Sequence, residues 1–200
     1  MQQSFAAVIL AGGGGRRMGG VDKAFVELAG RPLLAHVLNR LRPQTNRILL
    51  SANGDLSRFD NFDLPIVTDR RPDLGPLAGI AEAAAESWQR WPDVRLLLTV
   101  PVDSPLLPLD LGARLTAAVE HTGRPAVAEA GRRIHWTIGV WPVRTVLMMY
   151  HKVTEGGLRR VEDAVRQAGG TAVGFASPCA FANVNTPADL ERVAQSLGDS

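Results

Sequence analysis

A glycine-rich segment that carries positive charge follows an apolar run near the start of the chain. Residues 8–25 read VILAGGGGRRMGGVDKAF and contain six glycines, two arginines and one lysine. The backbone N–H groups of such a turn can converge on phosphate oxygens, and Arg17 and Lys23 would add charge at the mouth of that nest. Cations placed there suit the negative charge of a phosphoryl group during transfer. A solvated surface loop explains the composition equally well.

Two common phosphate-binding motifs do not fit this segment. A dinucleotide fingerprint, G-x-G-x-x-G, started at Gly12 has Arg17 in place of its third glycine, and the later starting points fail as well. A P-loop, G-x-x-x-x-G-K-[ST], reaches Gly19 or Gly20 with no lysine directly after it. The segment therefore predicts a different phosphate site at a strand end, in which Arg17 and Lys23 supply the charge.

Acidic and amide side chains follow the ends of the other apolar runs. Asn53 follows the run at residues 47–52, and Asp103 follows the run at residues 96–100. Asp69 follows a shorter apolar stretch between them. Ligands of an open parallel sheet bind beyond the carboxyl ends of its strands, and an acid that faces a phosphate nest there predicts a Mg²⁺ site completed by substrate phosphates. Turn formation and helix capping are the alternative roles for these residues.

A carboxylate at this edge of the sheet would also distinguish nucleotide bases. Guanine presents two adjacent donors, N1–H and the N2 amino group, which match the two acceptor oxygens of an aspartate. Cytosine has no such pair of donors on its pairing edge. The acids therefore favour GTP over CTP as the nucleotide.

The elements that must position these residues alternate between strands and helices. Continuous apolar runs predict strands buried on both faces of a parallel sheet, at residues 5–11, 47–52 and 96–100. Apolar residues at helical spacing predict helices that begin near Pro32 and Pro76. Further helices are expected over residues 111–119, 143–150, 158–168 and 187–197, and further strands over 126–128, 138–141 and 172–175. The alternation predicts one α/β domain over residues 1–200, a three-layer sandwich with a mostly parallel central sheet.

Composition narrows the functional class. The chain has 200 residues and a net charge of +2, which predicts one domain without a general attraction to nucleic acid or membranes. Its single cysteine, Cys179, cannot form an internal disulfide. The first residues hold neither a basic signal region nor an apolar run long enough to span a membrane. We therefore expect a soluble, cytoplasmic protein.

Four motifs together resemble the molybdenum cofactor guanylyltransferase family. They are, in order, LAGGGGRRMGGVDK, GPLAGI, VPVDSP and FANVNTPADL, and the resemblance runs from about the fifth residue to the last helix. It implies a Rossmann-like nucleotidyltransferase fold, shared with sugar-phosphate nucleotidyltransferases and molybdenum cofactor cytidylyltransferases. The implied activity is transfer of GMP from GTP to the terminal phosphate of molybdopterin, which yields the guanine dinucleotide cofactor and pyrophosphate.

The resemblance also implies the residues of the nucleotide site. Arg17, Lys23 and Asp103 would be catalytic, and Mg²⁺ would be held by Asp103, with Asn185 as a candidate second ligand. The contacts to GTP would come from Leu10, Ala11, Gly12, Gly13, Lys23, Asn53, Asp69 and Asp103. The two cations would neutralise the leaving pyrophosphate while molybdopterin attacks the α-phosphorus in line.

The C-terminal half is expected to hold molybdopterin. Asn183 and Asn185 alternate in an extended segment, so both side chains would point to one side, although helix entry alone also explains the sequence NVNTP. His135 lies where related sequences often read His-Pro-Thr, and Trp136 replaces the proline, so the shape of this loop is expected to differ. Arg160 is a candidate for the phosphate of molybdopterin, and a solvated helix face explains it equally well.

Three other functions remain open on the sequence. A cytidylyltransferase or a sugar-1-phosphate nucleotidyltransferase would share the fold, and a carrier that binds GTP or molybdopterin would do no chemistry. Asp69 and the GPLAG motif favour the guanylyltransferase over the other enzymes. Lys23 and Arg17 argue against a carrier, because binding alone needs no transition-state cations. Transient contacts with proteins that deliver molybdopterin or accept the product are a further expectation.

Overall fold

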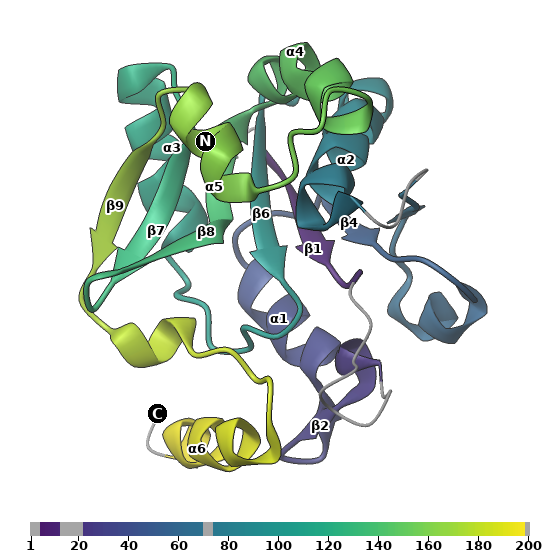
Figure 1. Ribbon diagram of the computed structural model, residues 1–200. Coiled ribbons are helices and arrows are strands. Elements are labelled where there is room, and N and C mark those ends of the chain that lie inside the picture. The colour runs from purple at the N-terminus through teal and green to yellow at the C-terminus, as the bar shows by residue number, and fades with distance from the viewer. Residues whose placement is uncertain (1–4, 13–21, 70–73, 199–200) are drawn as a thin grey trace.

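The computed structural model describes residues 5–12, 22–69 and 74–198. Its central sheet has seven strands in the order β5-β4-β1-β6-β8-β7-β9 (Figure 1). The strands are β1 (Phe5–Leu10), β4 (Ile48–Ser51), β5 (Ile66–Val67), β6 (Leu96–Pro101), β7 (Ala126–Ala130), β8 (Arg133–Pro142) and β9 (Thr171–Phe175). Four of the six strand pairings are parallel, and the two formed by β8 are antiparallel. The prediction of a mostly parallel sheet is confirmed.

Helices cover both faces of the sheet. One face carries α1 (Leu33–Leu41) and α3 (Leu111–Thr122), and the other carries α2 (Pro76–Arg90), α4 (Val143–Thr154) and α5 (Val161–Gln167). Successive side chains of β1 alternate between these two cores, with Phe5, Ala7 and Ile9 in the first and Ala6, Val8 and Leu10 in the second. A strand buried on both faces must be apolar throughout, as the run at its position indicates. The predicted three-layer sandwich is confirmed.

A third and smaller core joins the end of the chain to its first half. It lies between α6 (Pro187–Gly198) and the small hairpin of β2 (Glu27–Leu28) and β3 (Arg31–Pro32), and it contains Leu28, Leu106, Val184 and Val193. In Figure 1, α6 and β2 lie together at the end of the molecule toward which the arrowheads of β1 and β6 point. Because of this packing, the segment before α6 lies near the edge of the sheet where β1 and β6 end.

One helix begins later than the sequence predicted. The helix expected over residues 158–168 is α5, which starts at Val161. α4 ends at Thr154, Gly157 has a φ of +80°, and the N–H of Leu158 bonds back to the carbonyl of Lys152 at 3.0 Å. This bond satisfies one of the free carbonyls at the end of α4, so Leu158 belongs to the close of that helix.

Four parallel strands, β1, β4, β5 and β6, end at the same edge of the sheet. Backbone hydrogen bonds tie the residues just beyond them: the N–H of Ala11 bonds the carbonyl of Ser51 at 2.8 Å, and the N–H of Val102 bonds the carbonyl of Leu10 at 3.1 Å. Short 3₁₀ helices, η2 (Lys23–Phe25), η3 (Ser57–Phe62) and η5 (Pro178–Phe181), lie in the loops. Among the described helices, none has both the length and the apolar character that crossing a membrane requires.

Candidate functional site

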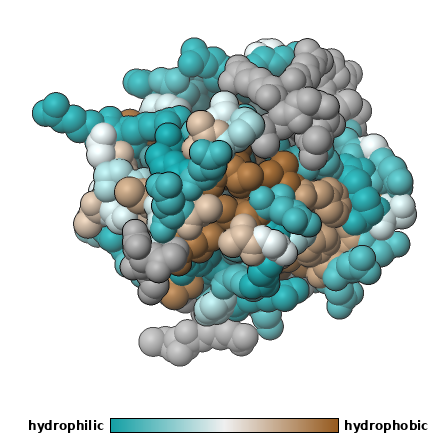
Figure 2. All heavy atoms as spheres, turned by 90° about the horizontal axis from the view of Figure 1, so that it is seen from below, coloured by the Kyte–Doolittle hydropathy of each residue, from teal (hydrophilic) through white to brown (hydrophobic). Residues whose placement is uncertain are grey.

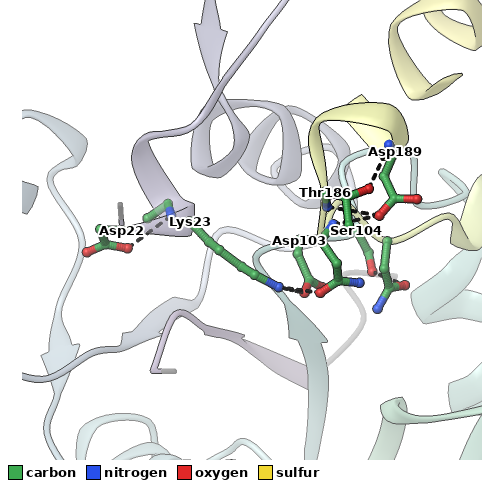
Figure 3. A network of polar contacts seen from close by, with 9 residues as sticks. Asp22, Lys23, Asp103, Ser104, Thr186 and Asp189 are labelled. Atoms are coloured by element: carbon green, nitrogen blue, oxygen red, sulfur yellow. Dashed lines mark hydrogen bonds and ion pairs between the residues drawn. The ribbon is translucent and has the colours of Figure 1, made fainter. Parts of the chain in front are cut away.

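Lys23 joins three segments that are far apart in the chain (Figure 3). Its Nζ donates to Oδ2 of Asp103 at 2.7 Å and to Oδ1 of Asn185 at 2.5 Å. Lys23 begins η2, Asp103 follows β6, and Asn185 precedes α6. The side chains of Lys23 and Asp103 are 22% and 15% exposed, so solvent screens this pair less than a surface ion pair. The structure thus brings together three residues that the sequence assigned to one site.

Backbone contacts hold the loop after β6 against the segment before α6. The carbonyl of Asp103 accepts the N–H of Val184 at 2.8 Å. The hydroxyl of Ser104 donates to the side-chain oxygen of Asn183 at 3.3 Å. Because the two segments are bonded directly, the positions of Asp103 and Asn185 relative to each other are set by the fold.

The oxygen atoms at this point suit a hard cation. Oδ1 of Asp103 is buried and has no hydrogen-bond partner within the described part of the chain. A buried carboxylate oxygen is unfavourable unless a ligand satisfies it. Mg²⁺ binds such oxygens together with substrate phosphates, and Asn185 presents a second oxygen beside Asp103. Over the residues that the structure covers, no three His, Cys, Asp or Glu side chains gather at one point.

Asn53 and Asp69 bind each other through two hydrogen bonds. Nδ2 of Asn53 donates to Oδ2 of Asp69 at 3.1 Å, and the backbone N–H of Asp69 donates to Oδ1 of Asn53 at 2.9 Å. Gly12 faces the same pair, since a Cβ on it would lie 3.7 Å from each side chain. Burial raises the pKa of Asp69, the hydrogen bond from Asn53 opposes this, and the charge of Glu82 adds to it. The ends of β1, β4 and β5 therefore meet around one partly desolvated acid.

The GPLAGI motif has a steric explanation. Gly75 has a φ of +72° directly before Pro76, the first residue of α2. Gly79 faces Ser51 and Asp69, and a Cβ on it would collide with Oγ of Ser51 and lie 3.3 Å from Oδ1 of Asp69. A larger residue would push α2 away from the acid. A glycine inside a helical pattern is the sequence signal of this close approach.

A cavity of about 330 Å³ opens beside Asn185. Its lining includes the predicted residues His135, Asn183 and Asn185, and also Arg133, Asp189 and Arg192, which the sequence analysis did not single out. Because Asn185 also contacts Lys23, the cavity and the Lys23–Asp103 pair share a residue. Figure 2 views the molecule from this end and shows apolar surface bordered by hydrophilic side chains.

His135 lines this cavity as an uncharged ring. It is 9% exposed, and its ring centroid lies 5.0 Å from that of Phe181. Burial lowers the pKa of His135, and the positive charge of Arg133 lowers it further. The imidazole is therefore neutral near pH 7, which suits packing against an apolar ring or hydrogen bonding to a neutral group.

Asp189 and Thr186 cap α6 and fix the backbone of Asn185 (Figure 3). The hydroxyl of Thr186 accepts the N–H of Asp189 at 3.2 Å, and Oδ2 of Asp189 accepts the N–H groups of Thr186 at 3.0 Å and Asn185 at 3.1 Å. Thr186 is therefore the N-cap of α6. The hydrogen bonds from Thr186 and from the N–H of Asn185 lower the pKa of Asp189, so this acid remains a charged acceptor.

The other predicted residues do not all lie at this edge of the sheet. Leu10 and Ala11 lie where β1 ends, whereas Gly13 and Arg17 are outside the described residues. Arg160 lies directly before α5, on the α2–α4 face of the sheet, and donates to Glu162 at 3.1 Å. It is not among the residues that line the cavity.

Arg133 and Arg192 reach the cavity from the β7–β8 hairpin and from α6. Neither gave a sequence signal, because an arginine in a hairpin or on an exposed helix face has the pattern of an ordinary solvated residue. Their convergence depends on the third core, which places α6 beside the hairpin end of the sheet.

The chain is similar to known proteins over most of its length. A family model described as the MobA-like NTP transferase domain matches residues 7–172. A molybdenum cofactor guanylyltransferase of Cereibacter sphaeroides is 45% identical over 190 residues, which make up 95% of each protein.

Solved structures share the fold. The molybdopterin-guanine dinucleotide biosynthesis protein A of Archaeoglobus fulgidus matches with a TM-score of 0.74 and 19% identity over 98% of this chain and 100% of that one. A 2-C-methyl-D-erythritol 4-phosphate cytidylyltransferase of Thermus thermophilus matches with a TM-score of 0.72 and 17% identity over 96% and 98%. The expected nucleotidyltransferase fold is confirmed, although fold alone does not separate one nucleotide from another.

Proposed function

The chain belongs to the MobA-like NTP transferase family and to its molybdenum cofactor guanylyltransferases, and on that basis we propose that it transfers GMP from GTP to molybdopterin. The acceptor is the terminal phosphate of molybdopterin, and the products are the guanine dinucleotide cofactor and pyrophosphate. The structural observation that carries the proposal is that Lys23 bonds both Asp103 and Asn185, and that Asn185 also lines the cavity. A donor site and an acceptor site must adjoin for transfer, and Asn185 belongs to both.

The reaction forms one P–O bond and breaks another. A phosphate oxygen of molybdopterin attacks the α-phosphorus of GTP, and the bond from that phosphorus to the oxygen of the β-phosphate breaks, so that pyrophosphate leaves. Such transfers depend on positioning and on neutralisation of charge. Lys23 supplies positive charge beside the acidic oxygens, and Arg17 is proposed to supply more from the glycine-rich segment.

Asp103 and Asn185 are proposed to hold Mg²⁺. The ion would supply positive charge that reduces the repulsion between the two anionic substrates. Lys23 neutralises Asp103 in the present arrangement, and its long flexible stem lets the ammonium reach phosphate oxygens nearby.

Asp69 is proposed to accept the N1–H and N2 amino donors of guanine. Asn53 holds both the backbone and one carboxylate oxygen of Asp69, so the acid is oriented before the base arrives. Gly12 leaves space in front of the pair. This assignment gives the site its preference for GTP over CTP.

The KM for GTP should rise as the pH falls. Asp69 accepts two donors only as a carboxylate, and burial places its pKa above the ordinary value of 3.8. Protonation therefore begins at a higher pH than for a solvated aspartate, and we expect the KM of the native protein to rise at a pH above the range in which a solvated aspartate would protonate. Asp69→Asn should have a higher KM throughout and lack this part of the pH profile. Identical pH profiles for the two proteins would contradict the role of Asp69.

The cavity is proposed to hold molybdopterin. Asn183 and Asn185 offer neutral polar groups, and the neutral ring of His135 offers a flat surface. Arg133 has no ion-pair or hydrogen-bond partner within the described residues, and Arg192 pairs only with Asp189 among them, at 2.5 Å. Both guanidinium groups are thus available to an anion on the acceptor.

Replacing Arg133 or Arg192 should weaken the binding of molybdopterin and leave the binding of GTP unaffected. We expect Arg133→Ala and Arg192→Ala each to raise the KM for molybdopterin about 10-fold to 100-fold, the loss of one charge-assisted hydrogen bond. The KM for GTP should stay within about twofold. Steady-state kinetics with each substrate varied in turn measures both constants. If Arg160→Ala raised the KM for molybdopterin and these two variants did not, the acceptor would bind near α5 and not in the cavity.

One incubation separates the candidate functions. The protein is mixed with Mg²⁺, molybdopterin and either GTP or CTP, and both pyrophosphate and the dinucleotide product are measured. We expect product with GTP only. Product with CTP would establish the cytidylyltransferase instead, and binding of GTP without product would establish a carrier.

A further inference from the structure

We propose that Arg58 is a positioning residue for GMP transfer. It couples Lys23 to the loop after β4 that carries Asn53, which we call the guanine-reading loop. It lies in η3, between the nucleotide-contacting residues Asn53 and Asp69, and nothing in its sequence context marks it. Its guanidinium group bonds both the segment that carries Lys23 and the loop that carries Asn53. The inference rests on the proposed function, because it assigns Arg58 a role in that reaction.

The first contact of Arg58 orients the start of η2. Nε of Arg58 donates to Oδ2 of Asp22 at 2.9 Å, and Oδ1 of the same carboxylate accepts the N–H of Ala24 at 3.0 Å. Asp22 is the N-cap of η2, and the next residue is Lys23. The carboxylate of Asp22 is therefore held from both sides, and Lys23 extends to Asp103 from a backbone that this carboxylate fixes.

The second contact holds the guanine-reading loop. Nη2 of Arg58 donates to the backbone carbonyl of Asn53 at 2.8 Å, and Nη1 donates to the carbonyl of Asp55. The side chain of Asn53 in turn exchanges two hydrogen bonds with Asp69. A planar guanidinium with several donors can hold two segments in one fixed geometry, which a single ammonium cannot do.

Aromatic packing joins the same two segments beneath the guanidinium. Arg58 lies over the ring of Phe59, 4.5 Å from its centroid, and the ring of Phe59 stacks on that of Phe25 at 5.2 Å between centroids. Phe59 belongs to η3 and Phe25 belongs to η2. A shift of one segment is therefore passed to the other through the rings as well as through Arg58.

The fold does not depend on Arg58 for its local structure. The carboxylate of Asp55 accepts both the N–H and the hydroxyl of Ser57, and so holds the turn that leads into η3 without Arg58. The Arg58–Asp22 pair is 29% and 30% exposed, and ion pairs with this exposure contribute little to stability. The main contribution of Arg58 is thus to geometry, and its removal should change kinetics much more than the melting temperature.

The test compares Arg58→Ala with a matched variant. Arg47→Ala removes an Arg–Asp ion pair, with Asp93 at 2.7 Å, from an arginine side chain that is also 29% exposed, although Asp93 is 62% exposed. We expect Arg58→Ala to lower kcat and raise the KM for GTP, with kcat/KM reduced about 10-fold to 100-fold, as misplacement of a catalytic group by about 1 Å would do. Arg47→Ala should stay within about twofold of the native kcat/KM. Both melting temperatures should fall by a few degrees at most, and that of Arg58→Ala should fall somewhat more, because Arg58 also donates to the carbonyls of Asn53 and Asp55.

A double-variant cycle shows whether Arg58 acts through Asp22. Asp22→Asn keeps an oxygen that can cap η2 and removes the ion pair, so we expect a kinetic loss similar to that of Arg58→Ala and little further loss in the double variant. Arg58→Lys, which restores the charge alone, should not restore kcat. Multiplied losses in the double variant, rescue by lysine, or an Arg58→Ala protein that matches Arg47→Ala would each overturn the inference. Absence of GMP transfer by the native protein would instead overturn the proposed function.

Discussion

Asp103→Ala should lower kcat for GMP transfer by about 10³-fold or more while the protein stays folded. Asp103 holds Lys23 by an ion pair at 2.7 Å, and its other oxygen is buried and free of partners within the described residues. We assign that oxygen to the metal that the triphosphate brings. Under the proposed mechanism, removal of the carboxylate takes away the proposed metal ligand and the anchor of Lys23 together, which is why this variant has the largest expected effect.

The stability of Asp103→Ala should change little. The substitution loses an ion pair but also removes a buried oxygen that has no partner among the described residues, and these two effects oppose each other. Asp110→Ala is a suitable control, because Asp110 precedes α3 and its side chain makes no capping hydrogen bond. We expect full transfer and an unchanged melting curve for the control. An Asp103→Ala protein with a near-native rate in Mg²⁺ would contradict the assignment of the site.

Lys23→Ala should lower kcat by about 10² to 10³-fold. The ammonium bonds two segments at 2.7 Å and 2.5 Å, beside the place assigned to the triphosphate. If the glycine-rich segment were instead a solvated surface loop, Lys23→Ala should change kcat very little. Single-turnover measurements at saturating GTP separate a loss in transfer from a loss in binding.

Two further variants test whether the effect of Lys23→Ala is specific to this residue. Lys152→Ala removes an exposed lysine of α4 and should leave kcat unchanged. Lys23→Arg keeps the charge but changes its shape and reach, and we expect it to remain well below the native rate. A full recovery of kcat with arginine would show that only the local charge matters and that the bonds to Asp103 and Asn185 do not.

Most strands and helices, and most residues of the proposed nucleotide site at the edge of the sheet, could be predicted from the sequence. The apolar runs that became β1, β4 and β6 are buried on both faces, so their pattern had one structural solution. Once those strands are parallel, their ends must adjoin, and Gly12, Asn53 and Asp103 therefore lie at one edge. The sequence analysis placed Lys23 and Asp103 at one nucleotide site, but it did not predict the ion pair between them, because 80 residues separate them.

The features that could not be predicted from the sequence depend on contacts between segments that are far apart in the chain. Nothing in the apolar residues of β8 indicates that it runs antiparallel to β6 and β7, because direction leaves no mark on composition. The roles of Arg58 and Arg192 come from segments that meet only in the folded chain. Arg160, in contrast, was a candidate for the phosphate of molybdopterin or a solvated residue of a helix face, and the structure places it directly before α5 and not in the lining of the cavity.

The fate of the phosphates of GTP tests the central claim most directly. The protein is incubated with molybdopterin, Mg²⁺ and GTP labelled either at the α-phosphate or at the γ-phosphate, and the products are separated. We expect the α-label in the guanine dinucleotide cofactor and the γ-label in pyrophosphate, because attack falls on the α-phosphorus. Transfer of the γ-label to molybdopterin, or recovery of both labels in unchanged GTP, would contradict nucleotidyl transfer at this site.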